Sequence, residues 1–221
     1  MTIVPLFPLN TVIFPGVSTP LHVFEERYRL LVRDLLATED PAERVFGVLA
    51  IREGYEVGEH GLQSLHRVGT LVQLGEVEEY DDGRFDIEVL GRQRLHVIDS
   101  DSTGPYLRGE VVLVDDVEEP GAAAEAERTM TTFEAYREQL SQLRGGPVLA
   151  GDMPRDPAYL SYALASTCLL TLPQRQLLLE AEGAQERLGT LRRTLHEEMR
   201  AMRALPSLPA TEVARTRWSP N

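Results

Sequence analysis

Apolar and polar residues alternate over much of the first half of the chain, which is the pattern of strands with one buried face. In the clearest stretch, Phe85, Ile87 and Val89 alternate with acidic residues. Asp82-Gly83 precedes this stretch and follows another β-prone run, which strongly favours a hairpin. Gly91 interrupts the alternation and predicts a bulge or bend. Strands are predicted at residues 45–51, 68–79, 84–90, 92–98 and 107–114.

The beginning of the chain has short apolar runs separated by prolines. Residues 3–24 are expected to be extended segments broken by turns, with their strands at sheet edges or bends. A first helix is predicted from about Glu25 to Leu36, where apolar residues recur at spacings of three and four. Its two leading glutamates suit the positive end of the helix dipole. Asp40-Pro41 ends this segment.

After residues 118–121 the apolar spacing changes from two to about 3.6, so the second half is predicted to be helical. Asp156-Pro157 opens one of these helices, with Asp as N-cap and Pro at the first helical position. The fold class is therefore α+β, with a small barrel or rolled sheet followed by a helical bundle. The predicted divisions are a β subdomain over 1–117, a helical subdomain over 122–204 and a tail over 205–221.

The charge of the chain restricts its chemistry. All 22 basic residues are Arg, the net charge is −13, and no Lys is present. A Walker-type phosphate-binding Lys, a Schiff-base Lys and a Ser–Lys dyad are therefore excluded. No apolar run approaches the ~20 residues of a membrane span, and no signal peptide is recognisable. The default expectation is a cytoplasmic protein that does not enter a membrane.

The residue types that carry chemistry elsewhere have simpler explanations here. Cys168 lies on an apolar helical stripe and is expected in the core. His60 and His66 share a segment with Glu56 and Glu59, and a metal site there is less favoured than a solvated loop. We therefore expect no metal and no cofactor.

Nucleic-acid binding is the main alternative based on surface charge. Arg92 and Arg94 alternate on one predicted strand and would share a face, to which Arg108 could contribute. Acidic residues on the same and neighbouring strands would cancel much of that field. A nucleic-acid partner is therefore disfavoured, although it remains the second interpretation.

Three stretches together resemble the N-terminal, substrate-binding domain family of Lon proteases. They are residues 5–32 with their Pro-Leu-Phe-Pro-Leu-Asn opening, residues 68–95 around the Asp82-Gly83 turn, and residues 172–188 beginning Leu-Pro-Gln-Arg-Gln. The resemblance covers about residues 3–204 and implies a PUA-like β subdomain followed by a helical bundle. It also implies recognition of unfolded or specific protein substrates. The nucleotide-binding and proteolytic motifs of Lon have no counterpart here, so a stand-alone, non-catalytic module is expected.

The expected partners are protein or peptide segments, together with a proteolytic machine supplied in trans. The hypothesised binding groove comprises Phe14, Pro15, Phe24, Glu26 and Arg27, where a helix start adjoins apolar residues that could accept an extended peptide. The alternative is that Phe14 and Phe24 simply fill the barrel. A small hydrolase is the third and least favoured functional class.

Overall fold

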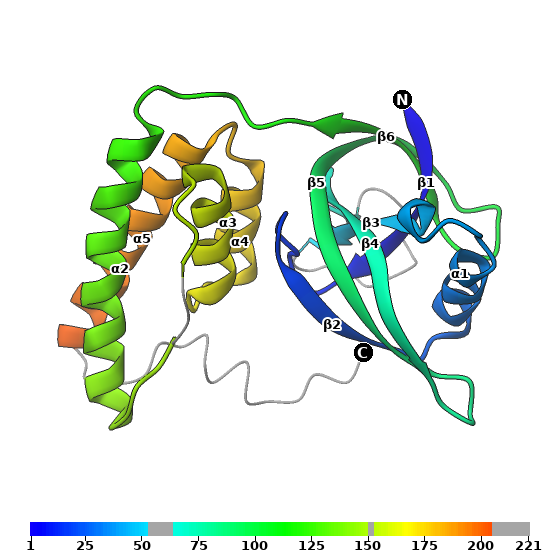
Figure 1. Cartoon of the computed structure of the whole chain (residues 1–221), viewed down its shortest axis with the longest axis horizontal. Coiled ribbons are helices and arrows are strands. Elements are labelled where there is room, and N and C mark those ends of the chain that lie inside the picture. The colour runs from blue at the N-terminus through cyan, green and yellow to red at the C-terminus, as the bar shows by residue number, and fades with distance from the viewer. Residues whose placement is uncertain (53–63, 150–152, 205–221) are drawn as a thin grey trace. The chain divides into compact units, whose positions relative to one another are not determined.

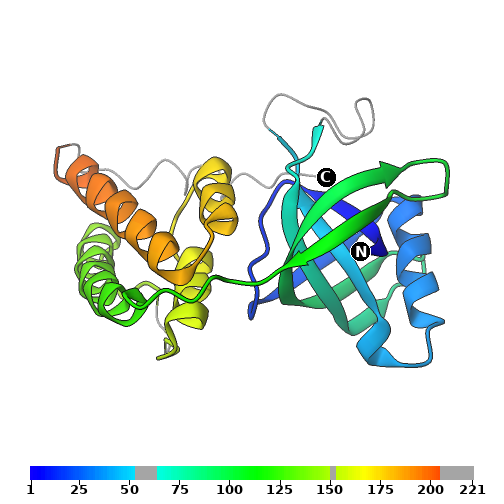
Figure 2. The ribbon, with the colours of Figure 1, turned by 90° about the horizontal axis from the view of Figure 1, so that it is seen from above.

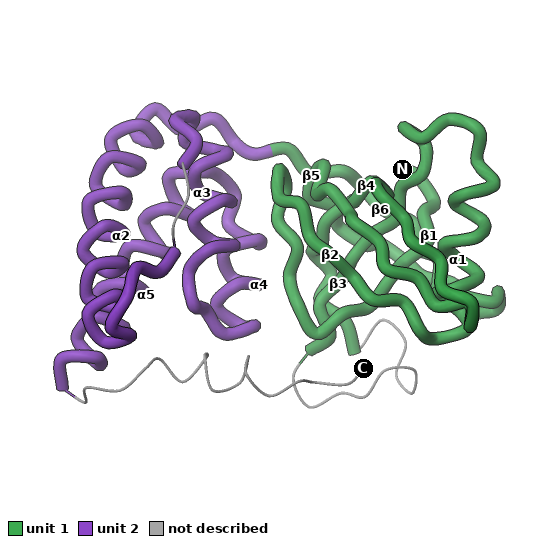
Figure 3. The backbone as a smooth tube through the Cα atoms, turned by 60° about the horizontal axis from the view of Figure 1, so that its bottom comes forward, with its two compact units in different colours: residues 1–115 green, residues 116–221 purple. Residues whose placement is uncertain are grey.

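The computed structural model describes residues 1–52, 64–149 and 153–204, and these form an α+β protein as predicted (Figure 1). The chain divides into two compact units, Met1–Asp115 and Asp116–Asn221 (Figure 3). The first, hereafter the barrel unit, contains every strand of the described sheet, and the second, the helical unit, contains four helices of the described chain. The predicted tail at 205–221 lies outside the described residues.

The six strands of the barrel unit form one mixed sheet. Its order is β2-β5-β4-β3-β1-β6, and a further pairing of β5 with β6 closes the sheet on itself. Within this sheet β1 and β3 are parallel, and the remaining pairs are antiparallel. The rolled sheet expected from the sequence is thus a closed barrel with β2 added at one margin. The strands are β1 Thr2–Leu9, β2 Ser18–Val23, β3 Val45–Ala50, β4 Val68–Glu79, β5 Phe85–Asp101 and β6 Arg108–Val114.

A bulge in β5 makes this closure possible. Leu71 pairs with Gln93 and Val72 pairs with Gly91, so Arg92 is an extra residue in the ladder. The bulge predicted at Gly91 is confirmed, but the division into separate strands 84–90 and 92–98 is wrong. The ladder continues through the bulge, which lets the first half of β5 pair with β2 and the second half with β6.

Gly91 also allows the chain to pass close to β5 before β2 begins. Its N–H donates to the carbonyl oxygen of Val17 at 3.0 Å, and its carbonyl accepts from the Gly16 N–H at 2.9 Å. A Cβ at Gly91 would lie 2.2 Å from the carbonyl oxygen of Phe14. Residues 12–14, expected to be extended and β-prone, form no strand and instead supply buried side chains before this crossing.

Helix α1, Glu26–Leu36, packs against one side of the barrel (Figure 2). Of the predicted stripe, Tyr28, Leu31, Val32 and Leu35 are buried in one cluster with residues from the strands, whereas Leu36, which was expected with them, is exposed. The Tyr28 ring stacks on Phe7 with 4.1 Å between centroids, and burial raises the pKa of Tyr28 to about 12. The start of α1 is thereby fixed to the barrel core.

In the helical unit, α2 and α5 lie side by side, and α3 and α4 pack beside them (Figures 1 and 2). The predicted cap is confirmed, because the Asp156 carboxylate accepts from the backbone N–H groups of Ala158 and Tyr159 at 3.0 and 3.1 Å. A capping box between Thr171 and Gln174 starts the next helix. The helices are α2 Ala122–Arg144, α3 Pro157–Thr167, α4 Leu172–Glu180 and α5 Ala184–Ala204.

A fully buried arginine holds the helical unit together. Two nitrogens of Arg187, on α5, each lie 3.0 Å from the Asp116 carboxylate oxygens, so the pair is bidentate. Arg187 also donates to the Ser161 hydroxyl at 2.7 Å and to the Leu178 carbonyl at 3.0 Å. Its guanidinium carbon lies 3.8 Å from the Tyr162 ring centroid. One side chain thus joins α3, α4 and α5 to the start of the unit.

Candidate functional site

Strand β2 is the open margin of the sheet. Among the described residues it pairs with β5 alone, from Ser18 opposite Leu90 to Val23 opposite Phe85. The other side of an edge strand presents backbone donors and acceptors that can pair with another chain. Pro20 lies within β2, and proline is tolerated in a sheet at such an edge because it lacks the N–H group.

Five side chains gather where β2 ends, and we call them the edge cluster: His22, Phe24, Tyr80, Arg84 and Asp86. His22 lies opposite Asp86 across the β2–β5 pair, with 2.6 Å between Nδ1 and Oδ1. The Tyr80 hydroxyl donates to Oδ2 of Asp86, also at 2.6 Å. The His22 ring stacks on Phe24 at 6.1 Å and meets Tyr80 edge-on at 6.3 Å between centroids. The predicted hairpin at Asp82-Gly83 carries Tyr80 and Arg84 to this place.

The edge cluster is fixed by hydrogen bonds but open to solvent. Phe24 is 40% exposed and Tyr80 is 38% exposed. The hydrogen bonds from Tyr80 and His22 lower the pKa of Asp86, and the bond to Asp86 raises the pKa of Tyr80. Asp86 is therefore ionised and Tyr80 is protonated at neutral pH. This arrangement offers apolar ring faces beside the Asp86 carboxylate and the Arg84 guanidinium, which suits binding.

The structure separates the five residues of the hypothesised groove into two groups. Phe24, Glu26 and Arg27 lie together at the end of β2 and the start of α1, with Glu26 exposed. Arg27 is bound to Glu25 at 2.6 Å and lies 4.7 Å from the Tyr28 ring centroid.

Phe14 and Pro15 lie before the other end of β2 and are buried, Phe14 with only 1% of its surface exposed. Six strand residues at about 3.3 Å each put roughly 20 Å between the two groups. Because the side chain of Phe14 is buried, it is not part of an exposed groove. The exposed part of the candidate site is restricted to the end with Phe24.

Sequence reasoning missed His22, Tyr80 and Asp86 as members of one site. The alternation of residues 85–89 correctly placed Asp86 on the wet face, and the turn at 82–83 was identified. Opposing residues could not be found, because the β2–β5 register joins positions 64 residues apart. The sequence contained one local indication of the site, which was a carboxylate, Asp86, and an aromatic residue, Tyr80, on the two sides of a predicted hairpin turn.

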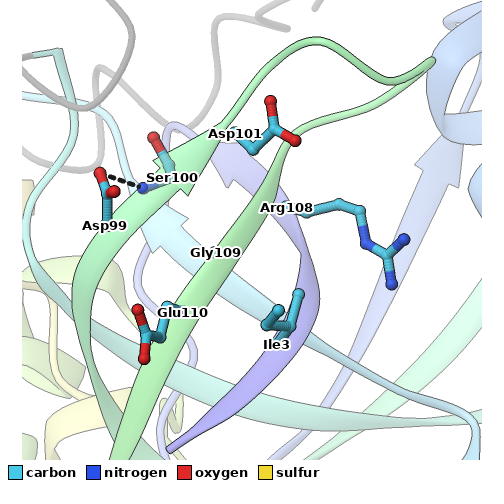
Figure 4. A pocket seen from close by; sticks show the side chains of 7 residues that line it. All are labelled: Ile3, Asp99, Ser100, Asp101, Arg108, Gly109 and Glu110. Carbon is cyan, nitrogen blue, oxygen red and sulfur yellow. Dashed lines mark hydrogen bonds between the residues drawn. The ribbon is translucent and has the colours of Figure 1, made fainter.

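The barrel unit also has an open hollow of about 350 Å³ on β1, β5 and β6 (Figure 4). Asp99, Asp101 and Glu110 supply carboxylates there, and Ile3 supplies an exposed apolar side chain. The guanidinium group of Arg108 extends away from Asp99 and Glu110 in Figure 4. The mixed charges and the small apolar surface of this hollow indicate no particular ligand, so the edge cluster is the better candidate for a functional site.

The arginine face considered for nucleic acid does not form. Arg92 is exposed, whereas Arg94 is buried with 3% exposure and donates to the backbone oxygen of Asp115 at 3.1 Å. The expectation that the two share a face is wrong, because the extra residue at the bulge shifts the alternation by one. With Arg94 buried, these two arginines offer no shared basic face to a nucleic acid.

The cysteine considered as a nucleophile lies in the core. Cys168 is fully buried, and burial raises the pKa of its thiol to about 12. The reactive form of cysteine is the thiolate, so this thiol is inert at neutral pH. Residues 56–60, with His60, Glu56 and Glu59, lie outside the described residues, so the metal-binding hypothesis for them is untested.

Comparison with known proteins identifies the family. Residues 3–197 match the model of the ATP-dependent protease La (LON) substrate-binding domain. The chain belongs to this family. Lon protease 2 of Herpetosiphon aurantiacus is 29% identical over 198 residues, which are 88% of this chain and 24% of that protein. The Lon protease of Escherichia coli is 23% identical over 199 residues, 89% of this chain and 25% of that protein.

Solved structures agree with this assignment. A Lon N-terminal domain protein from Xanthomonas campestris is 26% identical, with a TM-score of 0.60 over 86% of this chain and 97% of that one. The N-terminal domain of a Mycobacterium avium complex Lon protease is 19% identical, with a TM-score of 0.67 over 88% and 98%. The chain spans about a quarter of the length of the curated Lon proteases above, and its match is to their substrate-binding part. In the described part of the chain, no helix has the length and apolarity to span a membrane.

Proposed function

We propose that this chain is a non-catalytic recognition module that binds exposed apolar segments of other polypeptides along β2. The observation that carries the proposal is the open edge of β2, which ends at the exposed rings of Phe24 and Tyr80. A substrate-binding domain family supports a protein ligand in general terms. The open edge and the two exposed rings are the observations on which the proposed location rests.

Strand addition is the binding mode that suits this edge. An extended segment beside β2 would pair its main chain with the free backbone groups, and a side chain beyond Val23 would contact Phe24. Hydrogen bonds to the main chain depend little on the side chains of the segment, so one module should bind segments of many different sequences. Affinity should be about micromolar, or about −8 kcal/mol, because few apolar contacts accompany the backbone bonds.

Charge should select among apolar segments. Glu26 is exposed beyond the Phe24 end of this edge, and Glu88 is exposed on β5 opposite Pro20. Asp86 is ionised, and the whole chain carries −13. Basic, apolar segments should therefore bind better than acidic ones. Salt should reduce this preference, since exposed charges are screened over about 10 Å at 0.1 M ionic strength.

The test is a fluorescence-anisotropy titration of the full chain with a labelled, unfolded apolar peptide containing arginines. Phe24→Ala should weaken binding about fivefold to tenfold, since it removes about 1 kcal/mol of apolar contact. Glu26→Arg should weaken the basic peptide and strengthen an acidic version. The matched control is Leu177→Ala, which removes a 58% exposed side chain from the helical unit and should change nothing.

A second peptide tests the backbone contribution. N-methylation of every residue removes the hydrogen-bond donors from both edges of the extended peptide while keeping the side chains, and it should abolish binding. Equal affinity of the methylated and unmethylated peptides would exclude strand addition. Equal affinity of the wild type, Phe24→Ala and Glu26→Arg would exclude this location.

We assign binding, and not cleavage, to these 221 residues. The partner proposed to receive the bound segment is a proteolytic machine, in keeping with the Lon proteases that share this domain. Co-sedimentation of a bound segment with such a machine, in the presence and absence of this chain, would test that second step.

A further inference from the structure

A hollow of about 550 Å³ lies within the helical unit, at the start of the unit and far along the sequence from the edge cluster. Its walls are the segment from Asp116 to Ala122, the beginning of α3 around Pro157, and Ala184 at the beginning of α5. All of the lining residues belong to the helical unit. The volume is within the usual range of sites that bind small molecules or side chains, about 300–1,000 Å³.

Hydrogen bonds fix the walls of this hollow. The Asp116 carboxylate is held by Arg187 and by the Tyr162 hydroxyl, which donates at 2.7 Å. The Val117 N–H donates to the Glu182 carbonyl at 3.1 Å, and the Gln185 N–H donates to the Glu119 carboxylate at 2.6 Å. The site is therefore already formed before a ligand binds, so binding does not incur the entropic cost of ordering these walls.

The lining has only two kinds of side chain. Six residues are apolar, and among them Val117 is 56% exposed. The other four are carboxylates: Asp116, Glu118, Glu119 and Asp156. Among the described residues no basic side chain lines the hollow. The buried Arg187 contacts one of the four carboxylates, that of Asp116, from behind. Arg187 offsets the charge of Asp116, and helix N-terminal N–H groups bind Glu119 and Asp156. The exposed Glu118 adds a further negative charge beside the apolar floor.

This chemistry rules out two classes of ligand. The N-terminal N–H groups of α3 and α5, which could bind an anion, are already occupied by the carboxylates of Asp156 and Glu119. The carboxylates also do not converge as metal ligands, since no group of three acidic, histidine or cysteine residues in the described chain could hold an ion. A ligand with an apolar stem and a cationic end fits both kinds of wall.

We infer that this hollow is a second binding site, which takes an arginine or lysine side chain together with an adjacent apolar residue of a polypeptide. The methylene stem of a basic side chain covers apolar surface while its charged end reaches solvent or carboxylates. An arginine can bond a carboxylate in bidentate fashion, and Glu118 is exposed for such a contact. The site is independent of β2, so it stands even if strand addition fails.

The experiment is an amide NMR titration of the ¹⁵N-labelled full chain with a short capped peptide of alternating valine and arginine. The control peptide carries citrulline, which has the shape of arginine without its charge. The arginine peptide should shift the amides around residues 116–122, 156–158 and 184, and the citrulline peptide should not. High salt should weaken the binding several-fold.

Two variants locate the contacts without disturbing the hydrogen-bonded walls. Glu118→Gln should weaken the arginine peptide about threefold to tenfold, and Val117→Ser should weaken it by a similar factor. The matched control is Glu197→Gln, which changes an exposed glutamate on α5 away from the hollow and should have no effect.

The Phe24→Ala variant separates the two sites, because it should leave the shifts of the amides around the hollow unchanged while it weakens any shifts at β2. Equal binding of the citrulline peptide, or shifts confined to residues outside the hollow, would overturn the inference. Equal binding by Glu118→Gln and Glu197→Gln would also overturn it.

Discussion

The interiors of the two units differ in the kind of side chain that they bury. In the barrel unit, two clusters of apolar side chains fill the space inside the strands and under α1. In the helical unit, the largest fully buried side chain is a charged one, Arg187, and Glu125 is buried between Arg128 and Arg192. Apolar burial is non-directional, whereas buried charges require particular partners.

The difference indicates what each unit should tolerate. A barrel core can be repacked by residues of similar volume, but close backbone crossings cannot accept an added atom. A helical bundle whose interior is joined through one arginine depends on keeping both members of each charged pair. Substitutions of comparable size should therefore have different costs in the two units, and three measurements can test this.

The largest effect is expected at Arg187. Arg187→Met removes the bidentate cation from the Asp116 carboxylate, whose side chain is 19% exposed. It should cost the helical unit about 3 kcal/mol of unfolding free energy, the low end for breaking a buried ion pair. Arg200→Met removes an exposed arginine from the same helix and should change stability by less than about 0.5 kcal/mol. Urea unfolding followed by circular dichroism at 222 nm measures both, because α-helices dominate that signal.

A double variant sharpens this result. Combining Arg187→Met with Asp116→Leu removes both charges and should recover much of the lost stability. Failure to recover would mean that the hydrogen bonds from Arg187 to Ser161 and Leu178 matter more than the ion pair. Equal unfolding midpoints for Arg187→Met and Arg200→Met would refute the central role of Arg187.

An intermediate effect is expected in the barrel unit at Gly91. Gly91→Ala places a Cβ against the Phe14 carbonyl oxygen and should cost about 1–3 kcal/mol by forcing the backbone apart. Gly104→Ala is the control, since the nearest atom to its Cβ would be 3.7 Å away. The near-ultraviolet circular dichroism of the barrel tyrosines would follow unfolding. Indistinguishable midpoints would show that the crossing can relax at no cost.

The smallest effect is expected from protonation of Glu125. Burial by itself would raise the pKa of Glu125, but hydrogen bonds from Arg192 and Arg128 outweigh it and the pKa is lowered. Because the folded pKa lies below the ordinary value of 4.5, this carboxylate stabilises the helical unit above about pH 4.5. That stabilisation is lost as the pH falls through the folded pKa.

Glu125→Gln should remove this part of the pH dependence, so its unfolding midpoint should fall less between pH 6 and pH 3 than that of the wild type. Glu127→Gln, an exposed change on the same helix, should keep the wild-type slope. Parallel slopes for all three proteins would show that Glu125 is not a source of acid sensitivity.

Local signals in the sequence were reliable where the structure depends on neighbours in the chain. The turn at Asp82-Gly83, the bulge at Gly91 and the cap at Asp156 all follow from the conformational preferences of a few adjacent residues. The interpretation failed where a local irregularity had a distant consequence. The bulge was predicted, yet Arg94 was still expected on the same face as Arg92, whereas the bulge turns its side chain into the interior.

The candidate site was accessible to sequence reasoning only in part. Phe24, Glu26 and Arg27 were proposed together because they adjoin in sequence at a helix start, and Phe24 and Glu26 are exposed. Phe14 was included on the same grounds, but the chain between it and Phe24 is an extended strand that carries the two apart. Asp116 and Arg187 were not recognised as a pair, since 71 residues separate them.

The sequence by itself determined the α+β class, most of the secondary structure and the family, because hydrophobic period, turn residues and motif order are written along the chain. Only the tertiary structure decided that β5 pairs with β2 in its first half and β6 in its second, leaving β2 as the open edge. It also decided which charges are buried and which carboxylates share a hollow. These properties depend on contacts between distant residues, whose pairing is selected by packing of the whole unit and not by any local preference.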